Sequence, residues 1–313
     1  MLRARGDAGP TGILACVFTG LSAFPLTPFG QGVADLDAYS ALVADLAAAG
    51  VDSIGALGST GSYAYLHRGE RRALAAAAVQ AAGSTPVIVG VGAMTTRDVL
   101  AHVADAEAAG AAGVLLPPLG YQPLRPVEVL ALFEAVTAET ALPVVVYDNP
   151  VTTGLTFSGA LHAEIAALPG VASIKLPPVA ADPDRAHADL EGLRARIPGR
   201  VTLGVSGDGA GARGLIAGCD AWYSVLAGVF PRTCLEITRA ARSGDHRLAT
   251  ALSSELDPVW RLFEQFGSYR TVSAIAAEIG LITPEELPHP VLPLVGDERV
   301  AVRAALRAVG SRD

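Results

Sequence analysis

The sequence predicts an α/β fold, a (β/α)8 TIM barrel with a C-terminal helical extension. Eight short apolar segments rich in β-branched residues are typical of buried parallel strands, and amphipathic helical stretches separate them. The segments recur about every 28 residues, and eight such units are enough to close a barrel. An open doubly wound sheet is the competing fold, but it usually has fewer strands and a single switch point.

The elements can be placed in order along the chain. Several strands are expected to begin at a glycine or proline that ends the preceding stretch, as in AAG-VD, STP-VI and ALP-VV. The expected strands are 21–27, 52–58, 86–92, 112–118, 143–148, 171–176, 201–207 and 221–227. The expected helices between them are 37–49, 69–82, 97–109, 126–139, 158–167, 182–195 and 209–217.

The strand pattern stops near residue 242, which predicts how the chain is divided. Helical stretches follow at 245–266, 269–279 and 298–309, with a proline-rich link at 284–293. We therefore expect an N-terminal extension at 1–16, the barrel at 17–242 and a helical region at 243–313.

Composition limits the classes of partner. The chain has 313 residues, 51% of them hydrophobic, and a net charge of −8, which argues against nucleic acid or an acidic membrane surface as the main partner. Charged residues, glycine and proline interrupt every apolar stretch before it reaches the ~18 residues of a membrane span, and the apolar run 13–18 is too short for a signal core. The cysteines are odd in number, lack a CxxC spacing and suggest buried reduced thiols: Cys16, Cys219 and Cys234. We expect a cytoplasmic protein.

Lys175 is the only lysine, whereas 22 arginines supply the other basic side chains. It lies near the carboxyl end of the predicted strand 171–176, and barrel enzymes carry their active sites at that end of the strands. Burial lowers the pKa of a lysine and supplies a neutral amine, which can attack a ketone to form an imine. A surface lysine that happens to follow a strand is the plainer alternative. The complete replacement elsewhere by arginine favours a role that arginine cannot fill, because arginine does not lose its proton.

Two further strand ends carry polar groups that imine chemistry could use. Tyr147 ends the strand before that of Lys175 and could move protons, although a buried tyrosine is often only a packed aromatic. Ser59 and Thr60 lie in the turn GSTG after the second strand, where hydroxyls and glycine-freed N–H groups could hold a carboxylate. A plain strand-to-helix turn is the alternative for that segment.

Four segments together resemble the dihydrodipicolinate synthase and N-acetylneuraminate lyase family of class I aldolases. They are VFTGLSAFPLTPF at 17–29, GSTG at 58–61, YDNP at 147–150 and SIKLPP at 173–178. The similarity runs from about residue 17 to the end of the chain. Each segment is a weak signal alone, but the four in this order are highly specific.

The resemblance implies a barrel that forms a homo-oligomer, a tetramer or a dimer, and that binds pyruvate or a related 2-oxo acid as an imine without a cofactor. Lys175 resembles the Schiff-base lysine and Tyr147 the proton donor and acceptor. Ser59 and Thr60 resemble the hydroxyls that bind the keto-acid carboxylate and complete the proton relay. Tyr223 falls where family members offer a backbone carbonyl to the substrate, and Gly207 where a glycine lines the pocket.

The chain departs from the family pattern around these residues. Ser62 replaces a common glutamate and Asp148 a common asparagine. Thr152 stands where dihydrodipicolinate synthases carry the arginine that grips the carboxylate of aspartate semialdehyde. A tyrosine that such enzymes donate to the neighbouring subunit is replaced by Gly120, with Tyr121 one residue later. These departures favour cleavage or condensation of a sugar-acid-like compound over dihydrodipicolinate synthesis. They also leave open a ligand-binding barrel that has lost catalysis.

Three other sequence patterns bear on cofactor binding, metal binding and hydrolysis. The glycines of GAGARG, 209–214, match a GxGxxG pattern, but the next strand does not end in the acidic residue that a dinucleotide fingerprint needs. A phosphate site after the last two strands is the alternative for the same glycines. The six histidines show neither HxH nor HExxH, so no metal site is expected, and the absence of GxSxG argues against a common serine hydrolase.

Overall fold

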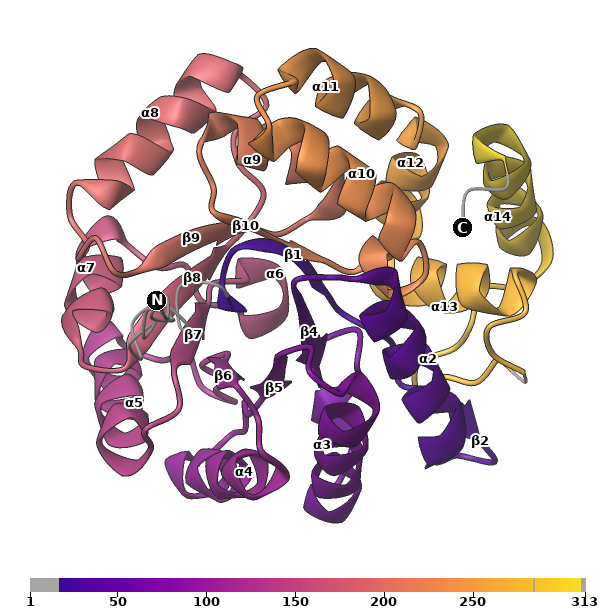
Figure 1. Ribbon diagram of the computed structural model, residues 1–313. Coiled ribbons are helices and arrows are strands. Elements are labelled where there is room, and N and C mark those ends of the chain that lie inside the picture. The colour runs from indigo at the N-terminus through magenta and orange to yellow at the C-terminus, as the bar shows by residue number, and fades with distance from the viewer. Residues whose placement is uncertain (1–16, 284, 311–313) are drawn as a thin grey trace, which may run out of the picture.

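The computed structural model describes residues 17–283 and 285–310. Eight parallel strands form a closed barrel, and a ring of helices surrounds it (Figure 1). The barrel prediction is confirmed. The proposed extension at 1–16, with Cys16, lies outside the described residues.

The barrel strands follow one another around the barrel in chain order, and β1 closes it between β4 and β10. Each strand overlaps one predicted segment, but most predicted segments run on into the loops because those loops begin with apolar residues and glycine. The strands are β1 (Gly20–Ala23), β4 (Ser53–Ala56), β5 (Val87–Gly90), β6 (Gly113–Leu116), β7 (Val144–Tyr147), β8 (Val171–Leu176), β9 (Thr202–Val205) and β10 (Ala221–Ser224). A short antiparallel pair, β2 (Phe29–Gly30) and β3 (Val33–Ala34), was not predicted.

The surrounding helices agree closely with the predicted stretches, except for the last of them, which was not predicted. They are α2 (Leu36–Ala49), α3 (Arg68–Ala82), α4 (Thr96–Ala109), α5 (Pro126–Glu139), α7 (Gly159–Ala167), α8 (Pro183–Arg194), α9 (Gly211–Ala217) and α10 (Pro231–Arg242). Four loops that follow strands carry single turns: η1 (Tyr63–Tyr65), α6 (Pro150–Thr153), η2 (Asp208–Ala210) and η3 (Leu226–Gly228). These loops all lie at the carboxyl ends of the strands, so they form one rim of the barrel.

The C-terminal helices are α11 (His246–Ser254), α12 (Asp257–Phe266), α13 (Ser268–Glu278) and α14 (Gly296–Val309). The predicted stretch 245–266 is two helices, and Pro258 lies in the first turn of the second, where a missing N–H costs nothing. In Figure 1, α13 and α14 lie outside the ring on the side of α2. Within the described ranges, no helix is both long and apolar enough to cross a membrane.

Local signals at the helix ends explain why the helices begin and end there. Among the described residues, six helices begin at a side chain that accepts a hydrogen bond from a first-turn N–H: Asp35, His67, Thr95, Ser158, Asp182 and Asp245. Helices α2 and α4 end at Gly50 and Gly110, whose φ angles of 81° and 83° suit glycine. These caps return the chain to the barrel at regular intervals.

The barrel interior is filled by a small set of large side chains that fit against glycines on neighbouring strands. A Cβ at Gly204 would lie 2.2 Å from the ring of Tyr223, and a Cβ at Gly55 would lie 2.3 Å from the ring of Phe24. The glycines therefore leave the space that these two rings occupy. Both rings lie beside Lys175.

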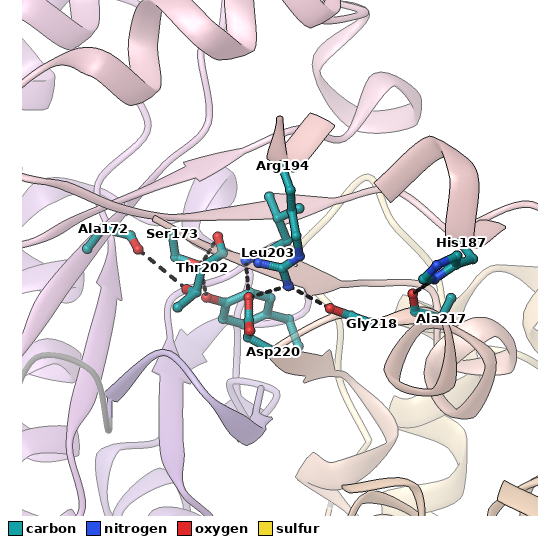
Figure 2. Close-up of polar contacts among 10 residues, drawn as sticks. Ala172, Ser173, His187, Arg194, Thr202, Leu203, Ala217, Gly218 and Asp220 are labelled. Atoms are coloured by element: carbon teal, nitrogen blue, oxygen red, sulfur yellow. Dashed lines mark hydrogen bonds and ion pairs between the residues drawn. The ribbon is translucent and has the colours of Figure 1, made fainter. Parts of the chain in front are cut away.

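Polar contacts hold β8, β9 and β10 in register near their amino ends, as Figure 2 shows. The Asp220 carboxylate accepts hydrogen bonds from Leu203 N and from Arg194 Nη2, both at 2.8 Å. Arg194 also donates to the Gly218 carbonyl at 2.6 Å. These contacts lie near the amino ends of β9 and β10, opposite the rim, and hold the two strands together there.

Candidate active site

Lys175 and Tyr147 lie side by side in the barrel interior. The register of β7 and β8 pairs the two residues directly, so their side chains point to the same face. Each residue is only 3% exposed, and Lys175 Nζ lies 4.5 Å from the centre of the Tyr147 ring. The two residues with the most specific predicted roles are therefore in contact.

Aromatic rings enclose the amine of Lys175. Nζ lies 3.8 Å from the ring centre of Phe24 and 5.7 Å from that of Tyr223. Burial lowers the pKa of Lys175 below its usual value, and the negative charges that Tyr147 and Asp208 can carry only partly oppose this effect. Lys175 therefore gives up its proton to yield the nucleophilic amine more readily than an exposed lysine does.

Asp208 is a buried carboxylate that interacts electrostatically with Lys175. It accepts hydrogen bonds from the Ser224 hydroxyl and from the backbone N–H groups of Val225 and Leu226. Burial raises the pKa of Asp208, whereas these donors and Lys175 act in the opposite direction. Asp208 is therefore a fixed electrostatic partner of the lysine, tied to the start of the loop after β10.

The hydroxyl of Tyr147 has two polar neighbours at hydrogen-bond distance. Ser59 Oγ lies 3.0 Å from Tyr147 Oη, and Asn149 Nδ2 donates to Oη at 2.7 Å. Burial opposes ionisation of Tyr147, but nearby positive charge and hydrogen bonds outweigh it and lower the pKa. The charge is that of Lys175, and the hydrogen bonds are those of Ser59, Asn149 and Thr152. The Tyr147 hydroxyl therefore loses its proton more readily than a tyrosine in water does.

The turn GSTG is held against the barrel mouth. Thr27 Oγ1 donates to the Gly61 carbonyl at 2.8 Å, and Thr60 in the same turn is 3% exposed. The contact of Ser59 with Tyr147 joins this turn to the pair on β7 and β8. The structure thus brings Ser59, Tyr147 and Lys175 together, with Thr60 next in the chain.

Gly207 and Tyr223 are placed differently from these residues. Gly207 has a φ of 76°, and a Cβ there would lie 2.4 Å from the ring of Pro178, so glycine is required at that position. Tyr223 is 1% exposed and its hydroxyl lies 2.7 Å from Ser173 Oγ, inside the barrel. Its side chain is thus part of the packing beside Lys175, while its backbone belongs to β10.

The residues that depart from the family pattern have partners of their own. Ser62 Oγ lies 2.6 Å from the hydroxyl of Tyr269 on α13, which ties the GSTG turn to the C-terminal helices. Asp148 Oδ2 lies 3.1 Å from His162 Nε2 on α7, and both side chains are buried. These contacts give Ser62 and Asp148 structural roles around the site.

Three residues of the site were not among those predicted. They are Phe24, Asn149 and Asp208. Phe24 carried no sequence signal, because an apolar residue in the first segment is typical of any core. Asn149 and Asp208 could have been found, since both follow strand ends that were already of interest.

The GAGARG glycines have a packing explanation. A Cβ at Gly211 would lie 2.3 Å from the Trp222 ring, and one at Gly214 would lie 2.6 Å from Val205. The glycines let α9 approach β9 and β10 closely. Among residues 17–283 and 285–310, no cluster of three or more His, Cys, Asp or Glu side chains could hold a metal ion.

Comparison with known proteins agrees with this geometry. The profile of the dihydrodipicolinate synthetase family matches residues 17–309. The chain belongs to this family. A 4-hydroxy-tetrahydrodipicolinate synthase from Xanthomonas campestris pv. campestris is 32% identical over 299 residues, covering 92% of this chain and 95% of that protein. One from Phenylobacterium zucineum is 29% identical over 296 residues, covering 94% and 98%.

The solved structures include a similar member of the dihydrodipicolinate synthetase family. A dihydrodipicolinate synthase from Agrobacterium tumefaciens str. C58 has a TM-score of 0.91 and 43% sequence identity, and the match covers 95% of this chain and all of that one. The family prediction is confirmed. The protein is therefore a class I aldolase or lyase of the dihydrodipicolinate synthetase family.

Proposed function

We propose that Lys175 forms an imine with pyruvate or a related 2-oxo acid and that the enzyme makes or breaks a C–C bond next to it. The neutral amine adds to the keto carbon, and the keto oxygen leaves as water. Loss of a proton from the adjacent carbon then gives an enamine, which attacks the carbonyl carbon of a second substrate. Water finally hydrolyses the imine and restores the amine, and the reverse sequence cleaves the product.

Tyr147 is proposed to move the protons of this sequence. Its hydroxyl gives a proton to the departing oxygen and to the oxygen of the second carbonyl, and its phenolate takes protons back. Ser59 would pass protons to and from Tyr147 across their 3.0 Å contact. Ser59 and Thr60 are proposed to hold the carboxylate of the 2-oxo acid together with the backbone of their turn, while Gly207 and the Tyr223 carbonyl line the pocket.

One observation carries the proposal: the only lysine of the chain is buried beside the ring of Tyr147, with Nζ 4.5 Å from the ring centre. Burying a lysine costs folding free energy and lowers its pKa, and strongly shifted pKa values cluster at functional sites. The neighbouring phenol supplies the acid and base that an imine needs.

Borohydride reduction in the presence of pyruvate tests the proposal. Lys175 is the only side-chain amine, so mass spectrometry of the SIKLPP peptide should show the reduced adduct. Lys175→Arg should abolish the adduct, because arginine keeps the charge but does not lose its proton. The chain N-terminus is the other amine of the chain, and its peptide is followed in the same digest for comparison. If pyruvate and several other 2-oxo acids all leave Lys175 unmodified, the aldolase assignment of this site is wrong.

For the second substrate we propose a sugar-acid-like compound rather than aspartate semialdehyde. Thr152 cannot hold a carboxylate by a bidentate pair, an interaction worth about 1.5–3 kcal/mol. The names of the relatives support the alternative, a 4-hydroxy-tetrahydrodipicolinate synthase. Assay of pyruvate with aspartate semialdehyde and with a panel of hydroxylated aldehydes separates the two, and a normal rate with aspartate semialdehyde would reverse the preference.

The alternative from another class is a barrel that binds a 2-oxo acid without turnover. The absence of a tyrosine at Gly120 motivates it. Imine trapping without exchange of substrate protons, and without C–C cleavage of any compound tested, would favour this alternative.

A homo-oligomer is proposed from the exposed apolar side chains of the rim. Tyr65, Met94, Tyr121 and Val151 are between 49% and 92% exposed and lie in four consecutive loops, after β4, β5, β6 and β7. Such a patch would be covered by a second copy of the chain. Analytical ultracentrifugation should show a dimer or tetramer, and Tyr121→Asp should shift it toward the monomer.

We also propose that the enzyme is cytoplasmic. Cys219 and Cys234 are buried thiols that form no disulfide among the described residues, as expected in a reducing compartment. Fractionation of cells that produce the protein would test the location.

A further inference from the structure

The side chain of Asn149 lies at the hydroxyl of Tyr147. Its Nδ2 donates to Tyr147 Oη at 2.7 Å, a shorter contact than the 3.0 Å to Ser59 Oγ. An amide N–H can only donate, so it occupies a lone pair of the phenol oxygen. The single proton of Tyr147 is then left for Ser59 or for a substrate in the barrel mouth.

The backbone of Asn149 is fixed from several sides. Pro150 follows it and restricts it to extended conformations, and its φ and ψ are −142° and 85°. Its carbonyl accepts hydrogen bonds from the backbone N–H groups of Thr152 at 3.1 Å and Thr153 at 3.0 Å. The hydroxyl of Thr153 also donates to that carbonyl, at 2.9 Å. The side chain of Asn149 therefore starts from a rigid point.

The side chain of Asn149 does not cap the helix that follows it. Asn149 is the N-cap residue of α6, and asparagine at that position normally accepts a hydrogen bond from the first turn of the helix. No such cap hydrogen bond is made by Asn149, although Asp35, Ser158 and Asp182 make one at their helices. The amide is turned to Tyr147 instead.

We propose that Asn149 is a positioning residue that holds the Tyr147 oxygen, favours its ionised form and directs its proton toward Ser59 and the substrate. The proposal rests on the proposed function, because it assigns Asn149 a part in the same proton transfers. An amide does not pass a proton on near neutral pH, so the relay runs through the hydroxyls beside Tyr147, those of Ser59 and Thr152, and not through Asn149. Tyr121, in the loop after β6, is 91% exposed to solvent.

Other titratable groups lie around Tyr147 and have to be kept constant in a test. Lys175 on β8 and Tyr63 in η1 interact with Tyr147, and Asp208 interacts with Lys175. The Asp148 and His162 side chains lie next to each other, on the loop after β7 and on α7. Substitutions at Asn149 change none of these groups. A shift in the titration of Tyr147 can then be assigned to the amide.

Two isosteric variants separate the amide donor from the shape of the side chain. Asn149→Leu removes the donor, and Asn149→Asp replaces it by a carboxylate that repels a phenolate. The Tyr147 phenolate is followed by its near-ultraviolet absorbance, as the difference between each protein and the same protein with Tyr147→Phe. The midpoint should rise in the order wild type, Asn149→Leu, Asn149→Asp.

The catalytic readout is exchange of the methyl protons of pyruvate with deuterium from the solvent, followed by NMR. Asn149→Leu should slow this exchange about 10- to 100-fold, the loss typical of one hydrogen bond to a charged group. Borohydride trapping at Lys175 should remain within about threefold, because the amine is untouched. Trapping that fails in the wild type would refute the proposed function, whereas the Tyr147 titration would still report on Asn149.

Thr153→Val is the matched control. It removes the hydroxyl that anchors the Asn149 carbonyl but keeps the amide at Tyr147, so exchange and the Tyr147 midpoint should stay close to wild type. If Thr153→Val lowers exchange as much as Asn149→Leu, or if Asn149→Leu leaves both exchange and midpoint unchanged, the positioning role is refuted.

Discussion

Replacing Phe24 by alanine is expected to raise the pKa of Lys175 and to slow imine formation at neutral pH. The Phe24 ring lies 3.8 Å from Lys175 Nζ and is 2% exposed, so it both excludes water from the amine and attracts the ammonium. The two effects act in opposite directions on the pKa. Loss of the ring would let water reach a polar site that can hold it.

The magnitudes decide which effect prevails. A desolvated cation–π contact stabilises an ammonium by about 2 kcal/mol, or about 1.5 pKa units. Full burial can lower the pKa of a lysine by about 3–5 units. Partial rehydration in Phe24→Ala should therefore raise the pKa of Lys175, because it weakens the larger of the two effects. Because only the neutral amine reacts, the rate of imine formation near neutral pH should fall about 10- to 100-fold.

The assay is the initial rate of borohydride trapping by pyruvate across a pH series. The rate rises as the pH passes the Lys175 pKa, and this midpoint should move to higher pH in Phe24→Ala and by a smaller amount in Phe24→Leu. Phe133→Ala is the control. Phe133 is fully buried on α5, in a different hydrophobic cluster from the one that contains Phe24 and Tyr147. Both alanine variants should lose about 3–5 kcal/mol of stability. A midpoint that stays in place or falls in folded Phe24→Ala would refute the reasoning.

Three further outcomes are expected. Tyr147→Phe should still form the imine but lower turnover by about 10²–10⁴, measured by single-turnover kinetics. Asp208→Asn should shift the trapping midpoint of Lys175 to lower pH, opposite to Phe24→Ala, because the carboxylate raises the pKa of the lysine; an upward shift would contradict this. Gly204→Ala should cost about 1–3 kcal/mol or more in urea unfolding, because the new Cβ would lie 2.2 Å from the buried Tyr223 ring.

The barrel, and the strand ends that carry the candidate site, could be predicted because their signals are local. Alternating strand and helix patterns are properties of short segments, and eight of them imply closure. The lone Lys175 was visible in the composition, and Tyr147 at the preceding strand end followed from the same pattern. The pair β2 and β3 was missed because two-residue strands carry almost no periodic signal.

By itself the sequence determined which segments form the barrel strands. It also determined which polar residues lie at or just after the carboxyl ends of these strands, namely Lys175, Tyr147 and Ser59. Only the tertiary structure decided what surrounds the amine. Phe24 lies 151 positions before Lys175 in the chain and reaches it only because β1 closes the barrel beside β10. Likewise, the direction of the Asn149 amide depends on a contact that competes with capping its own helix. Such contacts depend on closure and packing between distant segments, which no local pattern records.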